Sequence, residues 1–325
     1  MKAIQLQGYG DPAEVVRLVD VPVVGAPGPD EFIIDVEATP INGTDFMMMA
    51  GIYGFQPPLP HILGVEGVGR VSAVGRNVKH VREGDRTLIP PATPSWVERV
   101  KTDAAWLRPL PNADVSQLAM LGINPPTAYL LLTEFGPLNP GDWIIQNGAT
   151  SSVGRSVVVL AKAMGIKTVN VVRREESIAE IKALGGDIVL IDGADLPKRV
   201  AQETGHAKIA LAFDMVGGEA TLNLLQSITF NGTVVLYSAL SRKPFIGSSP
   251  QMIFNQQTIR GFWLVNWFKA AKPDAVIAGY EQLASLIASG AISASIAGTY
   301  SFDKFPEALA LASRFSGGKV ILTPH

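Results

Sequence analysis

The sequence predicts an α/β protein with two domains, one mainly β and one a doubly wound parallel sheet. The chain has 325 residues, a length that as a prior suggests two domains. Its first third consists of short β-branched segments separated by Gly, Pro and Asp, which is typical of a small barrel-like or sandwich-like domain. From about residue 114 onward, short apolar strands alternate with helix-period segments, which favours a parallel sheet with helices on both faces.

The elements can be followed in order along the chain. Strands are expected first at "KAIQLQ", "EVVRLVDVPVV", "EFIIDVEATPI", "GVGRVSAVG" and "DRTLIP". The second part predicts strands at "WIIQNGA", "KTVNVVRR", "DIVLI", "KIALAFDMV", "GTVVLYSA" and "IRGFWL". Helices are predicted between them at 152–164, 177–184, 195–204 and from about 218.

The end of the chain returns to β character. A helix at 273–289 is followed by "AGTYSF", a helix at 304–315 and "GKVILTP". We expect this closing piece to rejoin the first domain. The predicted domains are therefore 1–117 together with 264–325, and an inserted cofactor domain at 118–263.

Composition limits the function classes. Hydrophobic residues make up 47% and charged residues 17% of the chain, and the net charge is −2. These values predict a large core and favour neither nucleic-acid nor membrane binding. No signal peptide and no apolar run near about 18 residues is visible. We predict a cytoplasmic protein that acts on a small molecule.

A strand, a glycine-containing turn and a helix in "DWIIQNGATSSVGRSVVVLAKAMG" form the context that a dinucleotide fingerprint requires. The fingerprint is degraded, because only its last glycine is in register and small residues replace the others. Small residues still allow a phosphate to approach the helix N-terminus. The alternative is an ordinary turn between a strand and a helix. The predicted cofactor contacts here are Gly148, Ala149, Ser151, Ser152, Val153 and Gly154.

The next strand ends in two arginines. Arg173 stands 19 positions after Gly154 and is followed by Arg174. A chain built for NAD carries an acidic residue about 20 positions after the turn, where it binds the ribose 2′-hydroxyl. A guanidinium can instead bind a 2′-phosphate through paired hydrogen bonds. The sequence therefore predicts NADPH as the cofactor, with two solvated surface charges as the alternative.

These residues resemble the medium-chain dehydrogenase/reductase superfamily over the whole chain. The resemblance is greatest to its 2-enoyl thioester reductase branch, and the neighbouring quinone oxidoreductase branch shares many of the same features. It rests on "GIYGFQPPLP", "NPPTAYLLL", "QNGATSSVG", "NVVRRE" and "IRGFWLVNWFK", spread over residues 41–269. The resemblance implies a GroES-like mainly β catalytic domain and a Rossmann cofactor domain.

Comparison with the zinc alcohol dehydrogenases of this superfamily predicts that no metal is bound. Where they carry a Cys and a His, this chain has Asn42 and Val65, and it contains no cysteine. Glu66 remains, but one carboxylate cannot hold zinc, which takes three or four protein ligands. A reductase without a Lewis acid suits substrates that are already electrophilic, such as enoyl thioesters, enones and quinones.

The resemblance assigns a catalytic role to Tyr53. The reductase branch places a tyrosine in the loop that matches "GIYG". A phenol, with a pKa of about 10, stays protonated at neutral pH and can donate a hydrogen bond to a developing enolate oxygen. The alternative is a half-buried tyrosine whose ring packs and whose hydroxyl contacts water.

Other site residues also follow from the resemblance. Trp263 is predicted to line the acyl pocket, the alternative being a core or interface aromatic. Asn124 and Thr127 in "NPPTAY" are predicted near the cofactor, as is Asn42. Tyr237 ends a predicted parallel strand, where ligands sit in open sheets, although it can equally be a packing residue. Lys319 is expected at the surface. A homodimer formed through the segment around "QTIRGFWL" is also expected.

Three functions remain open from the sequence. The leading one is NADPH-dependent, zinc-independent reduction of the C=C bond of 2-enoyl thioesters, carried on acyl carrier protein or CoA. The second is a quinone oxidoreductase or enone reductase of the same fold. The third is an NADPH-binding protein without catalysis, which the degraded glycine turn keeps open.

Overall fold

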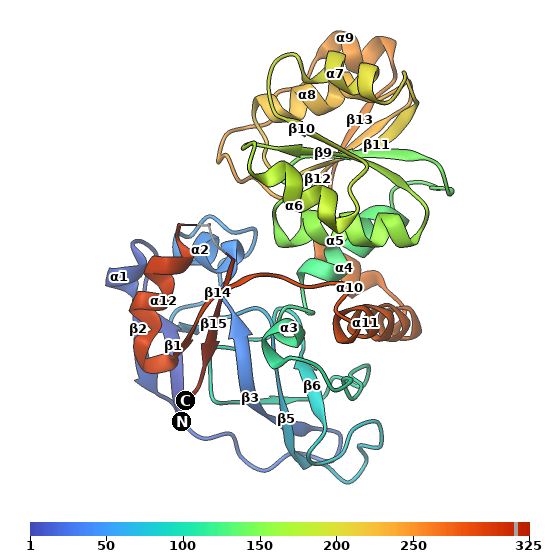
Figure 1. Ribbon diagram of the computed structural model, residues 1–325. Helices are drawn as coiled ribbons and strands as arrows, with labels where there is room; N and C mark the ends of the chain where they lie inside the picture. Colours follow the sequence, from blue (N-terminus) through green and yellow to red (C-terminus); the bar gives the residue numbers. More distant parts are fainter. Residues whose placement is uncertain (315–317) are drawn as a thin grey trace. The chain divides into compact units, whose positions relative to one another are not determined.

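The computed structural model describes residues 1–314 and 318–325 and divides into two compact units. Unit 1 comprises Met1–Ile123 together with Phe268–His325, and unit 2 comprises Asn124–Trp267. The chain therefore crosses between the units after residue 123 and again after residue 267, whereas the sequence predicts crossings after 117 and 263. The α/β fold class predicted from the sequence is confirmed (Figure 1).

Unit 1 is built on two sheets. In the smaller sheet, of order β2-β1-β4, both pairings are antiparallel. The larger sheet has the order β14-β15-β3-β5-β6, with β7 also paired to β3. The strands are β1 (Lys2–Leu6), β2 (Val16–Asp20), β3 (Phe32–Pro40), β4 (His61–Ile62), β5 (Gly67–Val74), β6 (Arg86–Ile89), β7 (Arg99–Thr102), β14 (Ile296–Ser301) and β15 (Lys319–Thr323).

The C-terminal segment joins the N-terminal sheet directly. β15 pairs antiparallel with β3, placing Leu322 opposite Thr39, and β14 pairs parallel with β15. The predicted helix 304–315 begins as α12, and its predicted last residue lies outside the described residues. The helical elements of unit 1 are α1 (Pro12–Val15), α2 (Gly43–Met49), α3 (Val115–Ala119), α11 (Pro273–Ala288), η1 (Phe302–Lys304) and α12 (Phe305–Ala312).

Unit 2 is a six-stranded sheet of order β10-β9-β8-β11-β12-β13, in which all pairings are parallel. Strand order reverses at β8, between β9 and β11, and open sheets of this kind bind ligands outside the carboxyl ends of the strands at such a point. The strands are β8 (Trp143–Gln146), β9 (Lys167–Val172), β10 (Ile188–Ile191), β11 (Ile209–Asp214), β12 (Thr233–Leu236) and β13 (Thr258–Gly261).

Helices cover both faces of this sheet. Figure 1 shows α5 and α6 on one face, and α7 and α8 on the other. Helix α10 contains the second crossing between the units. The helices are α4 (Asn124–Thr133), α5 (Ser152–Ala163), α6 (Ser177–Leu184), α7 (Leu196–Glu203), α8 (Glu219–Ser227), α9 (Ser249–Phe254) and α10 (Leu264–Ala270).

Each unit has its own apolar core. In unit 1, Ile4, Trp96 and Phe302 belong to one buried cluster that includes strand residues from both ends of the chain. In unit 2, Ile145, Ala212 and their neighbours pack beneath α7 and α8. The central strand β8 is short, apolar and almost fully buried, as expected for a parallel sheet covered on both faces. Its carboxyl end therefore has a fixed position, and the glycine turn begins there.

Candidate functional site

The turn between β8 and α5 has the shape of a phosphate-binding turn. Gly148 adopts φ +62°, and a Cβ there would lie 2.9 Å from Met215 Sδ. A Cβ on Gly154 would lie 2.6 Å from Gly148 O, so that the helix start packs directly on the turn. The Ser151 side chain caps α5 by accepting a 3.0 Å hydrogen bond from Gly154 N. These close approaches require glycine at the two positions, whereas small residues suffice elsewhere.

A buried glutamine supports the turn from below. Gln146 Nε2 donates to Gly154 O at 2.9 Å and to Asn170 Oδ1 at 2.8 Å. Gln146 and Asn170 are both fully buried, on the adjacent strands β8 and β9. No motif in the sequence indicates this pair. Its only signal is a polar residue at the end of β8 and another between the valines of β9.

A second buried pair, which the sequence likewise does not indicate, orders the loop after β11. Asn147 Nδ2 donates to Asp214 Oδ1 at 2.6 Å, and Met215 N donates to Asn147 Oδ1 at 2.7 Å. The backbone N–H groups of Val216 and Gly217 also donate to Asp214 Oδ1. Asp214 is therefore committed to holding this loop beside the glycine turn.

Arg173 and Arg174 follow directly after β9, the strand next to β8. Both are exposed. Arg174 lies 3.6 Å from an oxygen of the exposed Glu176, and such surface pairs contribute little stability. Arg173 forms no ion pair within residues 1–314 and 318–325. A guanidinium without an acidic partner at this edge of the sheet suits a phosphate ligand.

The Tyr237 hydroxyl is a buried polar atom without a hydrogen bond of normal geometry to any described residue. Burial raises the pKa of this hydroxyl well above its ordinary value, and the nearby Ser151 side chain offsets part of that rise. Tyr237 follows β12, at the same sheet edge as the glycine turn. A donor of this kind beside the turn fits a ligand oxygen there, and together with the open arginine it fits a phosphorylated dinucleotide.

The other predicted cofactor residues in unit 2 also have defined places. Ala149 is buried in the turn, and Ser152 and Val153 begin α5. Asn124 and Thr127 lie in the first turn of α4, with Thr127 buried. Trp263 is half-buried and directly precedes α10. Their contacts with a cofactor or substrate stay predictions.

Tyr53 belongs to unit 1. It is half-buried and packs against the apolar core of that unit. Its loop follows α2 through Gly51, at φ +69°, and is held by a 2.7 Å hydrogen bond from the Tyr9 hydroxyl to Pro57 O. Ile52 and Phe55, on either side of Tyr53, are 56% and 53% exposed. An exposed apolar loop around a phenol is suited to an apolar ligand.

Asn42 is part of a buried polar cluster in unit 1 that we call the ionic cluster, formed with Asp45, Glu66 and Lys319. Asn42 Nδ2 donates to Glu66 Oε1 at 2.8 Å, and Asn42 Oδ1 accepts from Lys319 Nζ. The backbone N–H of Asn42 donates to Asp45 Oδ2 at 2.7 Å. Because Asn42 uses both ends of its amide within this cluster, its predicted role as a cofactor contact stays a prediction.

The ionic cluster contains two carboxyl groups and one ammonium group. Burial raises the pKa of Asp45 to about 7 and that of Glu66 to about 7, and Lys319 partly offsets both rises. Burial also lowers the pKa of Lys319, against the attraction of Glu66 and then Asp45. Lys319, which was expected at the surface, is half-buried, and the pairing of β15 with β3 brings its ammonium group to the buried Asn42.

At the two positions where the resemblance places zinc ligands, this chain thus has an amide and a valine, and the Glu66 carboxylate accepts a hydrogen bond from Asn42. Val65 is 7% exposed and belongs to the apolar core of unit 1. Within the part of the chain that the structure describes, no three His, Cys, Asp or Glu side chains lie together so that they could hold a metal ion. Among those same residues, no helix is both long and apolar enough to cross a membrane.

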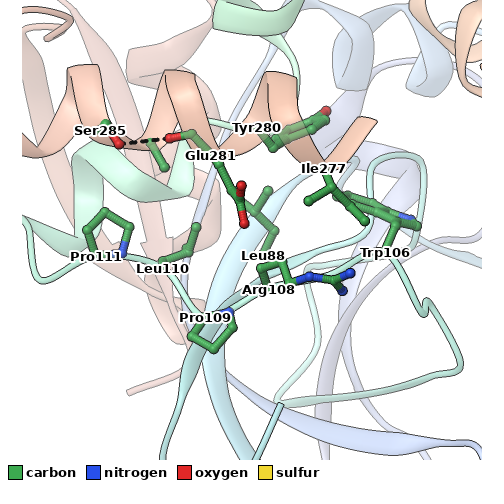
Figure 2. A pocket seen from close by; sticks show the side chains of 11 residues that line it. Leu88, Trp106, Arg108, Pro109, Leu110, Pro111, Ile277, Tyr280, Glu281 and Ser285 are labelled. Carbon is green, nitrogen blue, oxygen red and sulfur yellow. Dashed lines mark hydrogen bonds between the residues drawn. The ribbon is translucent and has the colours of Figure 1, made fainter. Parts of the chain in front are cut away.

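None of the predicted site residues lines a cavity that the structure contains in unit 1. It has a volume of about 390 Å³ and lies within unit 1, between α11 and residues 106–111. Figure 2 shows Trp106 and Arg108 on one side and Ile277, Tyr280 and Glu281 on the other. The sequence contains no motif that would have indicated this cavity.

Comparisons with known proteins agree with this geometry. Residues 28–112 match the family model "Alcohol dehydrogenase GroES-like domain", and residues 152–289 match "Zinc-binding dehydrogenase". The chain is 35% identical to the mitochondrial enoyl-[acyl-carrier-protein] reductase of Arabidopsis thaliana, over 95% of this chain and 84% of that protein.

Two solved structures share the fold over 99% of both chains. The quinone oxidoreductase of Pseudomonas syringae pv. tomato is 29% identical, with a TM-score of 0.86. Etr1p of Candida tropicalis, solved with NADP and crotonyl-CoA, is 23% identical, with a TM-score of 0.88.

Proposed function

Because the chain belongs to the medium-chain dehydrogenase/reductase superfamily of oxidoreductases, we propose that it reduces the C=C bond of 2-enoyl thioesters with NADPH. The observation that carries this proposal is the combination of two features. Unit 2 has a glycine turn followed by two exposed arginines, of which Arg173 has no acidic partner among the described residues, and unit 1 has a phenol in an exposed apolar loop. The similarity to an enoyl-[acyl-carrier-protein] reductase over most of both chains supports the choice of substrate class.

The residues of unit 2 fit NADPH. The turn at Gly148 and the start of α5 would hold the pyrophosphate, and Arg173 with Arg174 would bind the 2′-phosphate. The Tyr237 hydroxyl, which is buried and lacks a normal hydrogen bond, would donate to an oxygen of the cofactor. When bound, NADPH supplies the hydride that the β carbon of the enoyl group accepts.

Tyr53 would act on the other end of the conjugated system. As the β carbon accepts hydride, negative charge develops on the thioester oxygen, and a hydrogen bond from a phenol stabilises that charge. The exposed side chains of Ile52 and Phe55 offer an apolar surface for the acyl chain. A tyrosine is suited to this role because it remains a donor at neutral pH.

We propose that the reaction needs no zinc. The sequence has no cysteine, and Glu66 is bonded to Asn42 within the ionic cluster. Enoyl thioesters are already polarised by their carbonyl group, so a hydrogen-bond donor is sufficient where an alcohol substrate would need a Lewis acid.

A quinone acceptor is the second candidate, supported by the 29% identity to a quinone oxidoreductase over nearly the full length of both chains. The decisive measurement compares NADPH oxidation with crotonyl-CoA and with a quinone. Turnover of crotonyl-CoA that survives exhaustive treatment with a chelator supports the proposal. Turnover of the quinone alone would replace it by the second candidate.

A third possibility, NADPH binding without catalysis, would require binding but no turnover with any acceptor in that comparison.

We also propose a homodimer formed along β13. This strand is an edge of its sheet, and Ile253 and Phe254 of the preceding helix α9 are 66% and 76% exposed. Sedimentation of wild type and Ile253→Lys tests this; a monomeric wild type would contradict it. The cytoplasmic location stays a prediction.

A further inference from the structure

The first crossing out of unit 1 is held by a tyrosine that no motif singles out. Tyr280 on α11 is 6% exposed, and its hydroxyl donates a 2.8 Å hydrogen bond to Gly122 O. Gly122 stands one residue before Ile123, where the first of the two segments of unit 1 ends. Burial, and then the nearby Glu66 carboxylate, place the pKa of this phenol well above its ordinary value. The hydroxyl therefore remains a donor across the working pH range.

The other side of Gly122 faces the ionic cluster. A Cβ on Gly122 would lie 2.8 Å from Glu66 Cβ and 3.0 Å from Glu66 Oε2, so no side chain fits without displacement. The backbone N–H groups of Gly122 and Ile123 also stabilise the Glu66 carboxylate, partly offsetting the effect of its burial. Gly122, next to the first crossing, thus contacts the Glu66 carboxylate on one side and the Tyr280 phenol on the other.

The second crossing meets the same tyrosine. It lies inside α10, between Trp267 and Phe268. The Phe268 ring stacks on Tyr280, with ring centroids 5.9 Å apart and an interplanar angle of 28°. The Trp106 ring also packs against both side chains, with its centroid 5.2 Å from that of Tyr280 and 5.9 Å from that of Phe268. Tyr280 and Trp106 also line one end of the cavity (Figure 2).

We propose that Tyr280 is a positioning residue, which fixes both points where the chain crosses between the units, with Glu66 as its counterpart at the first crossing. This inference rests on the proposed function, because that reaction needs Tyr53 from unit 1 and a cofactor held by unit 2. The units are joined covalently only at these crossings. Loosening the first crossing displaces the start of α4, which carries Asn124 and Thr127, the residues predicted near the cofactor, and small misplacements reduce rates strongly.

Tyr280→Phe tests this most directly, because it removes the hydroxyl and keeps the stacked ring. We expect the amides of residues 122–124 to exchange hydrogen about tenfold faster, because Gly122 O loses its buried partner. We expect kcat for crotonyl-CoA to fall about fivefold, with the Kd for NADPH changed by less than twofold, because the glycine turn and the arginines that are predicted to bind the phosphates are left untouched. Tyr300→Phe is the matched control, a half-buried tyrosine of β14 in the same unit.

Gly122→Ala is the second variant, because it leaves Tyr280 intact and places a methyl group against Glu66. It should change the same amides and the same rate constant. Unchanged exchange at residues 122–124 in Tyr280→Phe would overturn the proposal, as would faster exchange with an unchanged kcat. Failure of the proposed function looks different: the wild type itself would oxidise no NADPH with crotonyl-CoA, and the exchange measurement would still decide whether Tyr280 holds the crossings.

Discussion

The glycine turn of unit 2 and the ionic cluster of unit 1 are both polar sites at the edge of apolar cores, but they are built in opposite ways. The turn is formed by neighbours in sequence, and it leaves Arg173 and the Tyr237 hydroxyl open to a ligand. The ionic cluster joins Asn42 to Lys319, 277 residues away, and its groups bond mainly to one another. The first arrangement is suited to receiving a molecule, and the second to holding unit 1 together.

The largest effect that follows from this contrast concerns Lys319. Replacing it by methionine leaves the buried carboxyl groups of Asp45 and Glu66 without a cation. Removal of one partner from a buried ionic group typically costs about 3–5 kcal/mol. We expect a loss of that size in the free energy of unfolding, measured by denaturant titration at pH 7.

The control for this variant is Lys304→Met, at an exposed position of η1 in the same unit. It should change the unfolding free energy by less than about 0.5 kcal/mol. An equal loss in both variants, or none in Lys319→Met, would show that the ionic cluster does not stabilise unit 1.

The second effect is a pH dependence of stability. Burial raises the pKa of Glu66 to about 7 from its unfolded value of 4.5, so between these values the folded state binds more protons than the unfolded state. The contribution of Glu66 is therefore most favourable below pH 4.5 and is lost as the pH rises toward 7. Such a shift corresponds to about 3 kcal/mol.

Comparison with Glu66→Gln removes this contribution, because the amide has nearly the same shape but does not titrate, and it also removes the part of the raised Asp45 pKa that Glu66 causes, which changes stability in the same direction. His61 and His80 have lowered pKa values, owing first to burial, and their opposite contribution cancels in the difference. We expect the stability of Glu66→Gln relative to wild type to rise between pH 4.5 and 7. A difference that is flat over this window would mean that Glu66 titrates normally.

The third effect tests the phenol. Tyr53→Phe should lower kcat for an enoyl thioester about a hundredfold, because the enolate oxygen loses its donor. The Kd for NADPH should not change, since the predicted cofactor turn lies in unit 2. Steady-state kinetics and fluorescence titration measure the two quantities, and Tyr300→Phe again serves as the control. A drop of less than twofold in kcat with crotonyl-CoA would remove Tyr53 from the mechanism.

The same contrast explains what the sequence could predict. The strand–turn–helix of unit 2 uses local signals: the glycines, the small residues and the arginines lie at fixed spacings on consecutive elements. The predicted helix 152–164 is observed as Ser152–Ala163 for that reason. Short apolar segments flanked by glycine also predict strands, so the alternation of strands and helices was sufficient to predict the parallel sheet.

The ionic cluster could not be predicted in this way. Lys319 has an ordinary sequence context after two glycines, and only the pairing of β15 with β3 carries its ammonium group to Asn42. Tyr280 likewise carries no motif, and its bond to Gly122 spans 158 residues. Contacts made by non-local strand pairing or helix packing have no spacing to detect in one sequence.

The smallest effect tests whether Arg173 and Arg174, at the sheet edge that carries the glycine turn, bind the 2′-phosphate of NADPH. Replacing both Arg173 and Arg174 by alanine removes the charge-assisted hydrogen bonds to a 2′-phosphate, and should narrow the preference for NADPH over NADH about tenfold. NADH binding should stay the same, because that ligand has no 2′-phosphate. Lys198→Ala, at an exposed position on α7 of the same unit, is the charge control. An unchanged preference, measured as the ratio of kcat/KM values, would mean that the arginines are only solvated surface groups.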